Sequence, residues 1–214
     1  MSLALVLPGC RKSKEQLAME HAGKIKKPGL IRVINLTGKP QTLTWGGRPL
    51  ASNIPKDFGT LFQTIGAGDQ KVGVEADGKQ EMELPLTVTT QELYTLVLFP
   101  GGKSTFIHDA QKLPDSTQNL SSYFVDSSGK PFDGKVTITD GTNTFDIDQS
   151  TGGMLIPEGE YTLKGDGLDI AQGSKVESDS AYSLIVIKTD EGRKVAMLMR
   201  NASPFKPARA GASG

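Results

Sequence analysis

The sequence of 214 residues has little of several residue types that carry chemistry or anchor a chain in a membrane. Its single cysteine, Cys10, cannot form a disulfide within one chain. Only two histidines, His21 and His108, are present. No run of about 18 apolar residues occurs, so no segment predicts a transmembrane helix. The formal net charge is zero, from 24 basic and 24 acidic residues, and nucleic acid is therefore not an expected partner.

Signatures of catalysis are also missing. A Ser-His-Asp triad could use only His21 or His108, and no Gly-x-Ser-x-Gly motif is present to expose a nucleophile. One histidine without a cysteine or a second histidine nearby makes a poor transition-metal site. The pairs Gly46-Gly47 and Gly101-Gly102 lie between predicted strands, whereas a phosphate loop precedes a helix. We therefore predict that the protein is not an enzyme and has no catalytic residue, cofactor or metal.

Carboxylates are the remaining candidates for chemistry. Paired acids can cleave glycosidic bonds or hold calcium. Sequences such as Asp140-Gly141, however, are typical of turns, and alternation over residues 145–148 places Asp146 and Asp148 together on a solvent-facing side. We favour structural roles for seven scattered aspartates of the second half, namely Asp126, Asp133, Asp140, Asp146, Asp148, Asp166 and Asp169.

What the sequence does contain is short apolar segments separated by turn residues. Glycine and proline number 25 and 12, which is more than usual. Segments rich in Val, Ile, Thr, Tyr and Phe at this spacing indicate an all-β sandwich or barrel rather than βαβ units. We predict strands near residues 30–36, 41–45, 58–65, 70–76, 81–88, 93–99, 104–108, 120–125, 135–139, 143–148, 160–165, 168–176, 181–187 and 193–199.

The two groups of strands match each other at an offset of 91 residues. Gly38-Lys39-Pro40 corresponds to Gly129-Lys130-Pro131, and Lys103 corresponds to Lys194. This repetition predicts two tandem small antiparallel β-sandwich domains of immunoglobulin-like or transthyretin-like type, with flexible tails at both ends. The predicted divisions are 1–29 for a signal and tether, 30–109 for the first domain, 110–119 for a linker, 120–201 for the second domain and 202–214 for a tail.

Within these units, periodicity predicts which residues are buried. The segment 30–36 alternates, so we expect one face to enter the core while Arg32 stays in water. The most apolar strands, 93–99 and 181–187, should run through the middle of each unit. Trp45, with Arg48 beside it, is a possible ligand contact, because an indole can stack on a sugar ring; packing in the core or at its edge is the favoured alternative.

The ends of the chain differ from the middle. An apolar run from Leu3 to Leu7 lies shortly before Cys10, which resembles the end of a bacterial lipoprotein signal peptide. The run is short and no basic residue precedes it, so we expect a truncated signal with lipidation of Cys10; the alternative is a free thiol in a cytosolic tail. Residues 11–29 carry a net charge of +4, which suits a tether beside anionic headgroups or simply a solvated linker. Residues 202–214 predict a disordered tail.

One family resemblance combines the opening strand 31–36 with the closing segment Leu93-Tyr94-Thr95-Leu96-Val97-Leu98-Phe99-Pro100-Gly101-Gly102-Lys103. This arrangement resembles the AlgF family of periplasmic accessory proteins in the O-acetylation of exopolysaccharides such as alginate. The resemblance covers residues 30–108 best, and the second unit also resembles a transthyretin-like envelope domain. It implies a non-enzymatic adaptor in the periplasm. The expected lipid on Cys10, which departs from a simple soluble periplasmic member of the family, and the basic tether would hold it at the membrane surface. The implied partners are envelope acyltransferase proteins or polysaccharide; the alternative is a surface lipoprotein acting as a glycan-binding, protein-binding or structural module.

Overall fold

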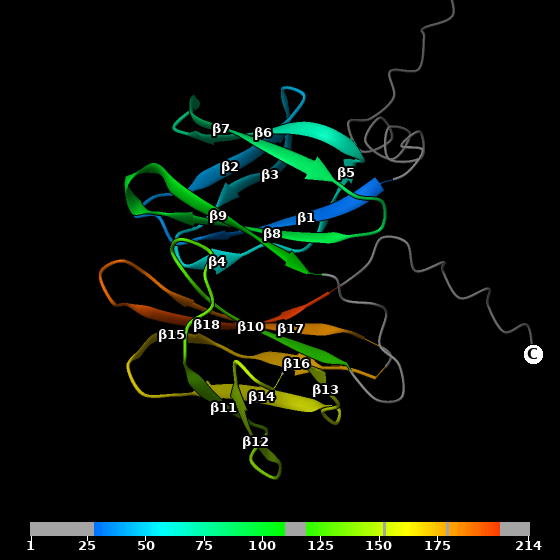
Figure 1. The fold of residues 1–214 in the computed structure, drawn as a ribbon, viewed down its shortest axis with the longest axis vertical. Helices are drawn as coiled ribbons and strands as arrows, with labels where there is room; N and C mark the ends of the chain where they lie inside the picture. The colour runs from blue at the N-terminus through cyan, green and yellow to red at the C-terminus, as the bar shows by residue number, and fades with distance from the viewer. Residues whose placement is uncertain (1–27, 110–118, 152, 179, 202–214) are drawn as a thin grey trace, which may run out of the picture.

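The computed structural model describes residues 28–109, 119–151, 153–178 and 180–201, and almost all of its regular structure is β (Figure 1). The predicted all-β sandwich class is confirmed. One short 3-10 turn, η1 (Pro100–Gly102), interrupts the strands. The strands are β1 (Pro28–Asn35), β2 (Gln41–Trp45), β3 (Arg48–Ile54), β4 (Phe58–Gly59), β5 (Gln63–Gly66), β6 (Gly68–Ala76), β7 (Lys79–Val88), β8 (Leu93–Phe99), β9 (Lys103–Asp109), β10 (Leu120–Asp126), β11 (Lys135–Thr139), β12 (Thr144–Asp148), β13 (Gly153–Met154), β14 (Gly159–Lys164), β15 (Leu168–Gln172), β16 (Ser174–Val176), β17 (Tyr182–Lys188) and β18 (Lys194–Arg200).

The strands form four sheets. Two are built from the strands before residue 110, which we call the first half, and two from the strands after residue 118, which we call the second half. The first half has an outer sheet in the order β3-β2-β6-β7 and an inner sheet in the order β4-β1-β8-β9, with β5 also paired to β1. The second half repeats this plan, with an outer sheet β12-β11-β14-β16 and an inner sheet β13-β10-β17-β18-β15. Pairing is antiparallel except where β1 meets β8, β10 meets β17 and β15 meets β18. No strand pair among the described residues joins one half to the other.

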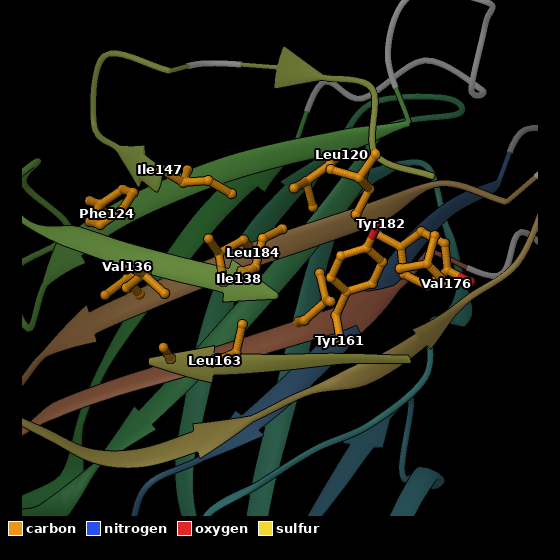
Figure 2. Packing of buried hydrophobic residues seen from close by; sticks show 14 residues of the cluster. Leu120, Phe124, Val136, Ile138, Ile147, Tyr161, Leu163, Val176, Tyr182 and Leu184 are labelled. Atoms are coloured by element: carbon orange, nitrogen blue, oxygen red, sulfur yellow. The ribbon is translucent and has the colours of Figure 1, made fainter. Parts of the chain in front are cut away.

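Each half has a core between its outer and inner sheets. In the second half this core contains residues from β10, β11, β14 and β17, among them Phe124, Ile138, Tyr161 and Leu184 (Figure 2). The outer strands are buried on one face only, so β14 alternates, with Tyr161 and Leu163 inside and Thr162 outside. This alternation is the one expected of a sheet that is covered on a single side.

A third core lies between the two inner sheets, which are adjacent in Figure 1. Strand β8 is buried along its whole length: Leu96 and Leu98 enter the core of the first half, whereas Val97 enters the shared core. On β17 Leu184 faces the second half's own core and Ile185 faces the shared one. The prediction that the two most apolar strands run centrally is confirmed, because each lies between two neighbours in an inner sheet.

The prediction that Arg32 stays in water is wrong. Its side chain is completely buried, because the second face of β1 is covered by the other half of the molecule. The guanidinium donates to Thr95 Oγ1 (2.8 Å) and to Asn201 Oδ1 (2.9 Å), and it lies over the Phe62 ring at 4.4 Å from the centroid. A polar residue on one face of an alternating strand indicates solvent only when no second layer covers that face.

Most of the predicted strands agree with the structure to within two residues, and the strands predicted at 41–45, 93–99 and 135–139 agree completely. Two strands were not predicted, β3 and the two-residue β13. The predicted strand 58–65 is divided into β4 and β5, and the predicted strand 168–176 into β15 and β16. The first strand begins at Pro28, and Asn119 belongs with the second half, where its side chain bonds both backbone groups of Ile156. The division into two independent domains stays a prediction.

The same local hydrogen bonds occur in both halves. Tyr94 hydroxyl accepts the backbone N–H of Thr89 (2.9 Å), and Tyr182 hydroxyl accepts that of Glu177 (2.8 Å), in each case from five residues earlier. A buried tyrosine needs such a partner for its hydroxyl. Each tyrosine therefore fixes the loop that leads into the central strand of its inner sheet.

Candidate functional site: the junction between the halves

Trp45 and Arg48 face each other across the β2–β3 hairpin, whose turn is Gly46-Gly47 with both φ angles positive. The glycine pair therefore forms the hairpin turn that the sequence predicts. Trp45 is half-buried against the core of the first half, and its indole N–H donates to Gln70 Oε1 (2.7 Å). Arg48 is exposed. This arrangement agrees with the alternative in which Trp45 packs at the edge of the core, and it leaves Arg48 as the accessible member of the pair.

His108 belongs to a polar cluster at the end of β9. Its Nε2 lies 2.6 Å from Glu92 Oε2, and its ring stacks on Tyr94 with the centroids 5.0 Å apart. Tyr94 hydroxyl also donates to Glu92 Oε2 (3.1 Å). Partial burial acts to raise the pKa of Glu92, but the hydrogen bonds from Tyr94, Thr89 and His108 together lower it below the usual value. His108 therefore takes part in a hydrogen-bonded contact with Glu92 at the end of a strand that lies at the edge of its sheet.

The aspartates of the second half serve turns and ion pairs. Asp140 accepts the backbone N–H groups of Thr142 (2.8 Å) and Asn143 (2.6 Å), and Asp148 accepts that of Ser150 (2.8 Å). Asp146, exposed on β12 like Asp148, pairs with Lys135 at 2.7 Å. These bonds lower the pKa values of the aspartates, led by the Asn143 amide for Asp140, the Lys135 ammonium for Asp146 and the Ser150 hydroxyl for Asp148.

Asp126 caps a turn in the same way, accepting the N–H groups of Ser128 (2.8 Å) and Lys130 (3.0 Å). Asp133 and Asp148 line an open hollow beside Lys135. Asp169 lies 3.6 Å from Arg193, and the backbone carbonyl of Asp166 accepts from Lys194 (3.4 Å). Across the described ranges no group of three or more His, Cys, Asp or Glu side chains is placed to hold a metal ion.

A small pocket of about 80 Å³ opens where the two halves meet. The first half contributes Leu36 after β1, the end of β8 with η1, and Lys103 at the start of β9. The second half contributes Ser127 and the tip of the β17–β18 hairpin. The lining residues are Leu36, Phe99, Pro100, Lys103, Ser127, Thr189, Asp190, Glu191 and Arg193.

Ion pairs across the junction hold the rim of this pocket. The Asp190 carboxylate accepts from the Lys103 ammonium and from the Ser127 hydroxyl, and these two bonds lower its pKa. Arg193 donates to Asp57 Oδ1 (2.8 Å), so it joins the same hairpin tip to the first half. Asp57 holds a positive φ of 58°, which is uncommon for a residue other than glycine. The junction is therefore fixed by polar contacts at its edge as well as by the shared apolar core.

The residues of this pocket were not predicted as a site from the sequence. Lys103 was singled out only because it matches Lys194 in the repeat. They lie far apart in the chain and meet only because the inner sheets pack together. One feature of the sequence marks this region without identifying its contacts: the connection after the second apolar strand, 189–193, is longer than the connection 100–102 in the first half.

Of the remaining predicted features, Cys10 and residues 11–27 of the basic tether lie outside the described residues, as do His21 and the tail 202–214. Within the described part of the chain, no helix has the length and apolar character needed to cross a membrane. In comparisons with known proteins, no family model and no curated protein matches the chain.

Proposed function

We propose that this protein is a non-enzymatic binding scaffold of the cell envelope, an accessory or adaptor protein for the O-acetylation of an exopolysaccharide. The observation that carries the scaffold role is the stack of three apolar cores, in which the shared core joins the two sandwiches. A tightly packed stack holds its surface loops at fixed separations, which an adaptor needs in order to present two partners to each other.

The link to acetylation is supported by the resemblance of the segments 31–36 and 93–103 to the AlgF family. Lipidation at Cys10 and a tether with a charge of +4 would place the scaffold at an anionic membrane surface. There the adaptor would increase the effective concentration of acyltransferase proteins around the polymer, because tethering makes each encounter nearly intramolecular.

The test is deletion of the gene, followed by measurement of acetyl groups on the purified polysaccharide. We expect a large loss of polymer-bound acetyl with unchanged polymer yield, and recovery on complementation with the unaltered chain. Unchanged acetylation in the deletion strain would contradict the adaptor role.

A matched complementation with Cys10→Ser tests separately whether the protein is anchored in the membrane by a lipid. The substituted protein should not incorporate labelled fatty acid and should leave the membrane fraction. If labelled lipid is absent from the unaltered protein as well, the lipoprotein assignment is wrong.

The second candidate function is a surface module that binds glycan or protein without any part in acetylation. The observation that favours it is the junction pocket, which combines apolar walls with hydrogen-bonding groups. It predicts retained acetylation after deletion together with measurable binding of an oligosaccharide by the purified chain.

A further inference from the structure

The hairpin beside the junction pocket differs in length between the two halves of the molecule. Tyr94 faces His108 across the β8–β9 hairpin, 14 residues later in the chain, whereas the corresponding Tyr182 faces Arg200, 18 residues later. The β17–β18 hairpin is therefore four residues longer, and its tip reaches the first half. That tip forms part of the pocket lining.

The walls of the pocket have two kinds of surface. Leu36, Phe99 and Pro100 provide an apolar wall from the first half. The hairpin tip contributes Thr189 and Asp190, whose carboxylate is bonded to Lys103, whereas the Thr189 hydroxyl oxygen is itself buried. An apolar wall opposite hydrogen-bonding groups suits a ligand that has C–H groups on one side and hydroxyl groups on the other.

Each cation beside the pocket already has a carboxylate partner, and Glu191 adds a further acidic group to the lining. Lys103 is bonded to Asp190, and Arg193 is bonded to Asp57 with Asp169 also near it. An added carboxylate or phosphate would have to displace one of these aspartates from its cation. The arrangement therefore favours an uncharged ligand over an anion.

One hydroxyl in the pocket lining has no partner. Thr189 is nine-tenths buried, and its Oγ1 makes no hydrogen bond with any part of the chain that the structure describes. Leaving a buried hydroxyl without a partner costs stability, so such a group indicates a missing partner. A turn of about 120° about χ1 moves Oγ1 to another staggered position on Cβ, so a bond between this hydroxyl and a ligand requires a rotamer change of Thr189.

We infer that this pocket binds the edge of an uncharged sugar residue of a polysaccharide, with the C–H side against Phe99 and Pro100 and a hydroxyl bonded to Thr189. The inference rests on the proposed role as a binding scaffold and names the kind of polymer it engages. At about 80 Å³ the pocket is well below the roughly 300–1,000 Å³ of sites that enclose a drug-sized ligand. It therefore takes one substituent and part of a ring, so we expect binding in the millimolar range for a short chain.

The experiment is an NMR titration of the full chain, labelled with ¹⁵N, with two probes of equal length: a neutral β-1,4-linked mannose hexasaccharide and a mannuronate hexasaccharide. We expect the neutral probe to shift the amides of residues 36, 99–103 and 189–193, and the uronate to bind about tenfold more weakly. Thr189→Val should weaken binding of the neutral probe about fivefold, the equivalent of one hydrogen bond, and Thr189→Ser should retain it.

The matched control is Thr162→Val on β14, where the threonine is exposed on an outer sheet. It should leave the titration unchanged. Because Thr189→Val removes a buried hydroxyl that lacks a partner, its thermal stability should be equal to or higher than that of the unaltered chain, and weaker binding will not reflect unfolding.

Three results would each overturn the inference: no shifts at the pocket residues, uronate binding as tight as neutral binding, or unchanged affinity in Thr189→Val. The result is independent of the acetylation assay. Sugar binding together with normal acetylation in the deletion strain supports the pocket and rejects the adaptor role. Lost acetylation without sugar binding rejects the pocket and keeps the adaptor role.

Discussion

Neighbouring residues on β17 offer a direct test of whether the shared core joins the two halves energetically. Leu184 and Ile185 are both fully buried, but Leu184 enters the core of the second half whereas Ile185 enters the core shared with the first. Substitution of either residue by alanine removes three carbon atoms. At about 0.8 kcal/mol for each buried carbon this is about 2.4 kcal/mol, and the remaining cavity brings the expected loss to about 2.5–4 kcal/mol.

The two variants should differ in where the stability is lost. Ile185→Ala removes contacts with a core to which Val97 on β8 and Ile34 on β1 contribute, so strands of the first half should open more easily. Leu184→Ala should weaken the second half and leave the first half's own core intact. The measurement is native-state hydrogen exchange of the full chain, with β1 and β8 as reporters for the first half and β11 as reporter for the second.

We expect Ile185→Ala to reduce the protection of β1 and β8 by at least about tenfold, which corresponds to about 1.4 kcal/mol. Leu184→Ala should change these two strands much less than it changes β11. Equal protection of β1 and β8 in the two variants, or a total loss below about 1 kcal/mol for Ile185→Ala, would refute the argument that the inner sheets form one cooperative core.

Three further predictions concern individual contacts. Tyr94→Phe and Tyr182→Phe each leave a backbone N–H without its hydroxyl acceptor, so urea unfolding should show a loss of about 1–3 kcal/mol in both variants, and a loss in only one would contradict the shared role. Gly173→Ala would place its Cβ 2.0 Å from a backbone oxygen and should cost about 1–3 kcal/mol, whereas Gly38→Ala, with nothing within 4 Å, should leave the melting temperature nearly unchanged. Hydrogen bonds from Asn143 and Thr142 lower the pKa of Asp140, so its contribution to stability is present above the unfolded value of about 4 and is lost as pH falls through the lower folded value. Thermal melts should show Asp140→Asn less stable than the unaltered chain at pH 7, with the difference shrinking below about pH 4; a constant difference would contradict this assignment.

The strands could be predicted from the sequence because alternation and turn residues are local signals. The hairpin at Gly46-Gly47 needs two positive φ angles, which glycine adopts without strain, and the structure has both. Strand β3 (Arg48–Ile54) was missed because its burial does not alternate: Arg48 and Pro49 are exposed, and only Ile54 is buried. An edge strand of this kind is held by its pairing with β2 rather than by an apolar face.

The junction pocket could not be predicted in the same way. Lys103 and Asp190 are 87 residues apart and meet only through the packing of the inner sheets. Turn-like sequences at both positions are equally consistent with solvated loops. Only the greater length of the second hairpin gave a sign in the sequence, and length alone does not say what a loop tip will contact.

Arg32 shows which features follow from the local sequence and which depend on tertiary contacts. Alternation over residues 30–36 determined that β1 is a strand and that Arg32 and Ile34 share one face, because side chains alternate along any strand. Whether that face meets water depends on what packs against it, and here it is the second half of the molecule. Local periodicity thus determined most of the strands and the core inside each half, whereas the shared core, the buried guanidinium and the pocket arise from contacts between sheets that no local pattern specifies.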